Sequence, residues 1–116
     1  MSLKLIVGNV AELLANMSSD NPPKKVVAGN PALFSNEIAE KPELYAGVWS
    51  STVGSWEIEA WPVHEVMVIQ SGRVRLTDRA GKPTEFGAGE MVVVPKGWSG
   101  LWETLEDVEK VYVIVP

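Results

Sequence analysis

The regular spacing of turn residues between short apolar runs, from Lys24 to the C-terminus, is the feature that most constrains the fold. Short apolar or alternating runs recur about every 8–12 residues with turn residues between them, which is typical of a β-sandwich or barrel. The expected strands are residues 44–51, 56–61, 65–69, 73–77, 91–94 and 108–115. The pattern therefore predicts an all-β domain over residues 24–116.

The first 23 residues follow a different pattern. Residues 3–7 are a short apolar run, which we expect to be an edge strand. Asn9 is a good helix N-cap, and Glu12 three residues later is placed for a capping box. Pro22 and Pro23 prevent the helix from continuing. We expect residues 1–23 to form an arm with a short helix, packed on the barrel or on a neighbouring subunit.

Composition and charge exclude several classes of partner. The net charge of −5 argues against nucleic-acid and anionic membrane surfaces, because both require a basic patch. No apolar run approaches the roughly 20 residues of a membrane-spanning helix, and the N-terminus lacks a signal-peptide pattern. The absence of cysteine excludes disulfides and thiol chemistry. We therefore expect a cytoplasmic protein with no nucleic-acid or membrane partner.

Residues 54–72 concentrate the side chains that carry chemistry. They include the only histidine, three of the 15 acidic residues and two of the five tryptophans. These residues are His64, Glu57, Glu59, Glu65, Trp56 and Trp61. The stretch is therefore the first candidate for a functional site.

Two glycine-bounded motifs resemble those of the cupin superfamily. Glu65, six further residues and Gly72 match the second half of the first cupin motif. Gly89, five residues, Pro95, one residue and Gly97 match the first half of the second motif. The resemblance implies a double-stranded β-helix, the cupin jelly-roll barrel, with a short N-terminal helical arm.

The chain is also similar to small single-domain, RmlC-like cupins that are related to (S)-ureidoglycine aminohydrolase and are mostly of unknown function. Their pattern PxGWxGxWE is followed by a lysine and a tyrosine on the last strand. It is matched by Pro95, Gly97, Trp98, Gly100, Trp102, Glu103, Lys110 and Tyr112. The resemblance also implies a homodimer.

The chain departs from the metal-binding cupins at the histidine positions. Depending on the spacing, the first two histidines fall on Glu59 and Trp61 or on Ile58 and Ala60, and the third falls on Gly100. No imidazole therefore stands at any of these positions. Carboxylates without imidazole make a poor site for a transition metal.

Glu65 alone keeps its place in the motif. We therefore expect no cofactor, while a hard divalent cation held by Glu59 and Glu65 with water ligands stays open. In a regular strand His64 points away from Glu65. His64 would join such a site only if a bulge near Pro62 displaced it.

Strand alternation leaves two alternatives for the lysine on the last strand: it faces carboxylates inside the barrel if these faces point inward, and it lies on the surface if they do not. On a regular strand one face carries Glu57, Glu59, Trp61 and Glu65. Lys110 and Tyr112 share a face of the last strand. Because a buried carboxylate needs a partner, we predict that Lys110 pairs with Glu65 or Glu59 and takes the charge role of a metal.

Three functions follow from these residues. The first is binding of a small molecule in the barrel, with the histidine metal site lost. The second is an aminohydrolase-like enzyme that cleaves a C–N bond in a small ureido or amino compound, with Glu65, Lys110 and Tyr112 as catalytic residues. The third is a structural or regulatory dimer with a packed barrel. The candidate pocket residues are Trp56, Glu59, Trp61, Glu65, Trp98, Trp102, Lys110 and Tyr112.

Overall fold

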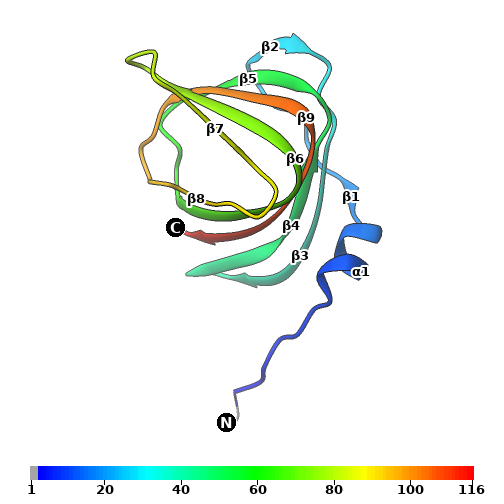
Figure 1. Ribbon diagram of the computed structural model, residues 1–116. Helices are drawn as coiled ribbons and strands as arrows, with labels where there is room; N and C mark the ends of the chain where they lie inside the picture. Colours follow the sequence, from blue (N-terminus) through cyan, green and yellow to red (C-terminus); the bar gives the residue numbers. More distant parts are fainter. Residues whose placement is uncertain (1–2) are drawn as a thin grey trace.

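The computed structural model describes residues 3–116, which form one short helix and nine strands of a curled antiparallel sheet (Figure 1). The helix α1 is Val10–Ala15. The strands are β1 (Ser18–Ser19), β2 (Val26–Gly29), β3 (Leu33–Lys41), β4 (Leu44–Ser51), β5 (Gly54–Ile58), β6 (His64–Asp78), β7 (Pro83–Gly87), β8 (Met91–Val94) and β9 (Gly100–Val115). The all-β fold with a short N-terminal helix is confirmed.

The two longest strands, β6 and β9, pair with each other along most of their length. The other edge of β9 pairs first with β5 and then with β4, and the other edge of β6 pairs with β8 and then with β7. The sheet therefore curls on both sides of the β6–β9 pair into a barrel shape, seen end-on in Figure 1.

Residues 65–69 and 73–77, expected as separate strands, belong to the single strand β6. Gly72 lies at the bend between them with φ of 88°. A Cβ there would lie 2.2 Å from the carbonyl oxygen of Asp107, so the strand bends against β9 only with glycine at this position. This contact explains physically why a glycine closes the first motif.

The inner face of the barrel carries the apolar core. Met67, Ile69, Val74 and Val108 are each at most 1% exposed. They alternate along β6 and β9 with half-buried or exposed outward residues, as expected for strands with one face against a core.

The N-terminal arm differs in part from the expectation. The Asn9 side chain accepts a hydrogen bond from the Glu12 backbone N–H at 3.0 Å, so the predicted helix start is confirmed. Helix α1 packs outside β3 and β4, where the Asn36 amide donates to the Leu13 carbonyl at 3.2 Å.

The edge strand predicted at residues 3–7 is wrong. This segment is extended but unpaired and leads away from the barrel (Figure 1), with Leu3 and Leu5 96% and 94% exposed. The outer edge of β3, the end of this half of the sheet, already pairs with β1. Within residues 3–116 the helix is too short to cross a membrane.

Candidate functional site

Strand β5 ends earlier than expected, and this changes which side chains enter the barrel. Ala60 has φ of 47°, and its N–H donates to the Ser99 hydroxyl at 2.8 Å. The backbone N–H of Trp61 donates to the Trp98 carbonyl at 2.8 Å, which fixes the chain to the 95–99 loop instead of to a strand. The expectation of one regular face over residues 56–61 is therefore wrong.

The break leaves Glu65 as the only buried carboxylate of that predicted face. Trp56 and Ile58 are buried on the inner side of β5, whereas Glu57 and Glu59 are exposed. Glu59 forms an ion pair with Lys25, which lowers the pKa of Glu59 and raises that of Lys25 through their hydrogen bond and mutual charge.

A cavity of about 730 Å³ occupies one end of the barrel interior. This volume lies in the range of about 300–1,000 Å³ that is usual for small-molecule sites. Its aromatic lining residues are Trp49, Trp56, Trp61, Trp102 and Tyr112. Its ionisable lining residues are Asp20, Lys24, Glu37, Glu57, Glu59, Glu65 and Lys110.

Lys110 and Glu65 form a buried ion pair on the wall of this cavity. Nζ of Lys110 donates to Oε2 of Glu65 at 2.6 Å, and the two side chains are 6% and 5% exposed. The same ammonium lies 4.2 Å from the ring centre of Trp49 and 5.0 Å from that of Trp102. The predicted pairing of Lys110 with Glu65 is confirmed, and two aromatic faces share in holding the charge.

Three tryptophans pack as one cluster behind the ion pair. Trp56 and Trp102 are stacked with ring centres 5.5 Å apart, and Trp49 meets both edge-on. Such arrangements are the favourable ones for aromatic quadrupoles. The cluster forms an apolar wall of the cavity.

A chain of hydrogen bonds fixes the orientation of Trp102. Its indole N–H donates to Oγ1 of Thr104 at 2.8 Å, and Thr104 lies 3.0 Å from Oγ of Ser51. Because the Ser51 hydroxyl donates to the Thr52 carbonyl at 2.7 Å, the Thr104 hydroxyl donates to Ser51. All three side-chain groups are therefore satisfied within the wall.

Tyr112 reaches the cavity from β9 and donates a hydrogen bond to Oε2 of Glu37 at 2.6 Å. Burial raises the pKa of the Tyr112 hydroxyl far above its ordinary value. The hydrogen bond to Glu37 and the charges of Glu37, Glu65 and Asp20 raise it further. The hydroxyl therefore stays protonated and remains a hydrogen-bond donor over the whole physiological pH range.

Glu37 was missed in the sequence analysis. It lies on β3, whose register places it opposite Gly47, and Gly47 lies opposite Tyr112 on β9. A Cβ on Gly47 would lie 2.4 Å from the Asn36 carbonyl oxygen, so glycine permits this close packing of strands. Residues 33–38 read LFSNEI, two apolar residues followed by three polar ones, so no alternation marked Glu37 in the sequence.

Trp98 does not line the cavity. Its ring lies against Gly100, where a Cβ would be 2.5 Å from the ring and 2.2 Å from the Thr77 carbonyl oxygen. Gly100 stands at the third histidine position of the metal-binding pattern. This position has no room for a side chain.

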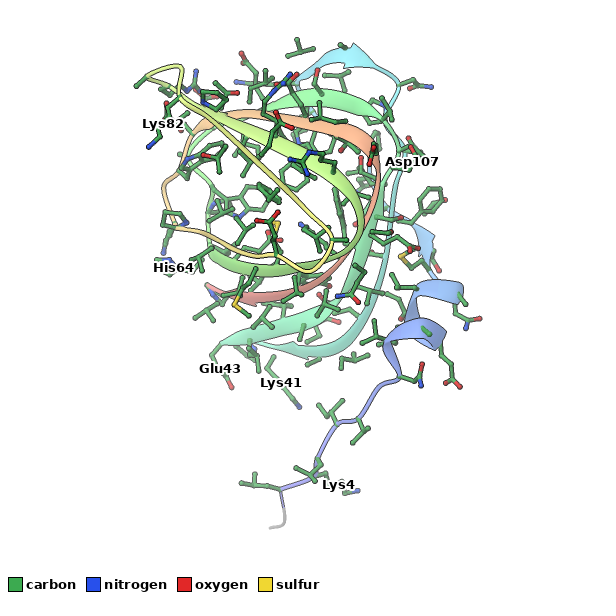
Figure 2. All side chains as sticks on the ribbon, viewed as in Figure 1. Lys4, Lys41, Glu43, His64, Lys82 and Asp107 are labelled. Atoms are coloured by element: carbon green, nitrogen blue, oxygen red, sulfur yellow. The ribbon has the colours of Figure 1, made fainter. Side chains whose placement is uncertain are left out.

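His64 lies on the outside of the barrel (Figure 2). Its Nδ1 accepts a hydrogen bond from the backbone N–H of Lys96 at 3.1 Å, so Nδ1 is not the protonated nitrogen in this contact. Among residues 3–116, no three histidine or acidic side chains are grouped to hold a metal ion.

The comparisons with known proteins identify the family. Residues 39–112 match the model of the EutQ-like cupin domain. The chain belongs to this cupin family. A comparison with curated proteins found no match.

Solved cupin structures agree with the fold. A protein of unknown function in the DUF861 family from Pseudomonas syringae pv. tomato is 28% identical, with a TM-score of 0.81 over 88% of this chain. The match covers 45% of that protein, so the cupin chain spans less than half of its length. A DUF861 protein from Thermotoga maritima is 31% identical over 56% of this chain and 73% of its own, with a TM-score of 0.54.

A more distant structure shows the same fold only. The EutQ protein of Clostridium difficile is 16% identical, with a TM-score of 0.66 over 74% of this chain and 69% of its own. The predicted cupin fold is therefore confirmed. The chain is a cupin-domain protein of unknown function.

Proposed function

We propose that this cupin binds a small organic molecule in its barrel, with the Lys110–Glu65 ion pair in place of a histidine metal site. The observation that carries the proposal is the cavity of about 730 Å³ with this pair in its wall. A cavity of this size beside Glu65 also counts against the alternative in which the barrel is merely packed.

The ion pair supports a site that works without a resident metal. Glu65 stands where the metal-binding pattern has a ligand, and the Lys110 ammonium already occupies its Oε2. A cation at that oxygen would have to displace a lysine that two tryptophan faces also hold. Gly100 gives no room for the third imidazole.

A second candidate is an enzyme of the aminohydrolase type. The observation in its favour is that Glu65, Lys110 and Tyr112 line one cavity. Tyr112, which stays protonated, would donate a proton to a leaving nitrogen, and Lys110 would stabilise negative charge on a carbonyl oxygen. Release of ammonia from small ureido and amino compounds, lost in Tyr112→Phe, tests this candidate.

A homodimer is also proposed, with each copy using the outer face of β8, β6 and β9. Outward residues there are apolar: Val66, Val68, Val111 and Val113 are half-buried, and Met91, Val93 and Val115 are 69%, 61% and 44% exposed. An exposed apolar sheet face suits a second identical face, as in a two-fold interface. Val113→Glu should convert a dimer into a monomer in light scattering; a monomeric parent protein would contradict the proposal.

A thermal-shift screen tests the binding proposal, because a ligand that binds only the native state raises the melting temperature. Ser35 lines the cavity and Ser50 lies on the neighbouring strand outside it. We expect Ser35→Phe to abolish the shifts that small amines, ureides, carboxylates or sugars produce, and Ser50→Phe to keep them. Mn, Zn, Ni and Fe salts should give no shift, and near-stoichiometric metal in the purified protein would contradict the metal-free site.

A further inference from the structure

The positive charges beside the cavity are already committed to partners. Lys110 is held by Glu65 and by the faces of Trp49 and Trp102. Lys25 is held by Glu59 at the rim. Each ammonium already has a carboxylate partner, so neither adds net positive charge to attract an anionic ligand.

The remaining lining charges are mostly negative. They are the three acidic residues Asp20, Glu37 and Glu57 and the one basic residue Lys24. Within residues 3–116 none of the four takes part in an ion pair. Three carboxylates and one ammonium leave the cavity with two uncompensated negative charges. All four residues are exposed, so these charges lie on the solvent-facing side of the cavity, where salt screens them.

Three carboxylates act on the Tyr112 hydroxyl, and two of them, Glu37 and Asp20, belong to exposed residues. The carboxylates of Glu37, Glu65 and Asp20 all contribute to the raised pKa of the Tyr112 hydroxyl, beside the larger effect of burial. Oε1 of Glu65 has no hydrogen-bond partner among the described residues, and it is not fully buried. It therefore remains an acceptor facing the cavity that Glu65 lines.

The aromatic wall favours the same charge sign. Tryptophan faces attract cations through the ring quadrupole, with greater effect where water is excluded. The chain's own Lys110 ammonium illustrates this chemistry, because one carboxylate and two indole faces hold it. Trp56 and Trp61 extend the apolar lining beyond that pair.

We propose that the cavity receives a small organic cation, an amine or quaternary ammonium on a flat or aliphatic body. The cationic group lies toward Glu37 and Asp20 beside Tyr112, and the apolar body lies against the tryptophan wall. This inference rests on the proposed function, because it names the ligand class of the same cavity.

The experiment compares three probes of similar shape and different charge by calorimetric titration of the full chain. Phenethylamine is the cation, phenethyl alcohol is neutral and hydrocinnamate is the anion. We expect phenethylamine to bind about tenfold or more tighter than the alcohol and to weaken with salt, because a charge-assisted interaction is screened. Hydrocinnamate should not bind measurably.

Matched variants locate the cationic group. Glu37→Gln keeps an acceptor for Tyr112 but removes the charge, and Asp20→Asn tests the second carboxylate. Glu43→Gln removes the same charge at the β3–β4 hairpin, away from the cavity (Figure 2). We expect Glu37→Gln to weaken amine binding about tenfold, Asp20→Asn to weaken it less, and Glu43→Gln to leave it unchanged.

The outcomes separate the two proposals. If the alcohol or hydrocinnamate binds as tightly as the amine and Ser35→Phe abolishes binding, the cation inference fails and the binding function stands. Amine binding that Glu37→Gln and Asp20→Asn do not weaken also overturns the inference. If no probe binds and no compound of the wider screen shifts the melting temperature, both proposals fail.

Discussion

Nζ of Lys110 lies 2.6 Å from Oε2 of Glu65, and neither side chain is more than 6% exposed. Removing one partner of a buried pair leaves an uncompensated charge, which costs about 3–5 kcal/mol of unfolding free energy. We therefore expect Lys110→Met and Glu65→Leu each to destabilise the protein by about that amount in urea unfolding. The double variant should recover most of the loss, because it buries no charge.

The exposed pair of Arg73 and Glu85 is the control for this cycle. Its Nε–Oε1 distance is 3.0 Å, but the side chains are 47% and 40% exposed. Such pairs contribute at most about 1 kcal/mol. If the losses of unfolding free energy in the two single variants add up in the double variant, the two side chains contribute independently. The ion pair would then not explain why a lysine is buried at position 110.

Arg75 and Glu103 predict part of the acid sensitivity. They lie directly opposite each other on β6 and β9, with Nε–Oε1 and Nη2–Oε2 distances of 2.9 and 3.0 Å. The hydrogen bond to Arg75 is the main reason that the pKa of Glu103 lies below its ordinary value of 4.5. The Arg75–Glu103 pair therefore stabilises the folded state fully above pH 4.5, and this contribution disappears as the pH falls through the lowered pKa of Glu103.

We expect Arg75→Met to lower the urea midpoint at neutral pH, and the difference from the parent protein to vanish in acid. Arg75→Lys should recover only part of the loss, because lysine cannot make the two-point contact. A difference that persists unchanged at low pH would show that the arginine stabilises the sheet through packing of its stem and not through Glu103.

Tyr112 predicts a loss of stability in alkali. Its pKa is raised above the ordinary value of 10.0 by burial and by Glu37, so the folded state retains a proton that the unfolded state releases. The unfolding free energy contributed by this group is complete below pH 10.0 and falls as the pH rises above it. The advantage of the parent protein over Tyr112→Phe should shrink over that range, and a constant difference would contradict the assignment.

Part of the site follows from local sequence rules. A carboxylate at Glu65 inside a barrel needs a partner. Lys110 is the candidate because it shares one face of the last strand with Tyr112. Alternation groups Lys110 with Tyr112 on one strand face, but it does not say which face is the inner one. The bounds of β4 and β8 agree with the expected strands for a similar reason, because short runs between turn residues leave little freedom of register.

The rest of the site depends on contacts between distant segments. Strand β5 stops at Ile58 because Ala60 and Trp61 bond to the loop at Trp98 and Ser99, almost forty residues later. Glu37 enters the site because β3 pairs with β4 in a register that a pattern of single residues does not reveal. Alternation describes one strand at a time, and these features arise between strands.

Gly100 predicts that the histidine metal site cannot be restored by one substitution. A Cβ at this position would lie 2.2 Å from the Thr77 carbonyl oxygen, which belongs to the strand paired with β9. Overpacking of this kind costs about 1–3 kcal/mol, so Gly100→Ala should lower the unfolding free energy by that amount. Gly100→His should destabilise the protein at least as much and give no Zn or Ni binding in calorimetry.

Two further variants show that the backbone contact is the cause. Gly87→Ala adds a methyl group whose nearest neighbours lie 3.2 Å away, so it should cost less than Gly100→Ala. Trp98→Ala removes the ring that covers Gly100 but leaves the Thr77 carbonyl in place. It should therefore not rescue Gly100→Ala, and a full rescue would assign the closed position to the tryptophan ring instead of to the pairing of β6 with β9.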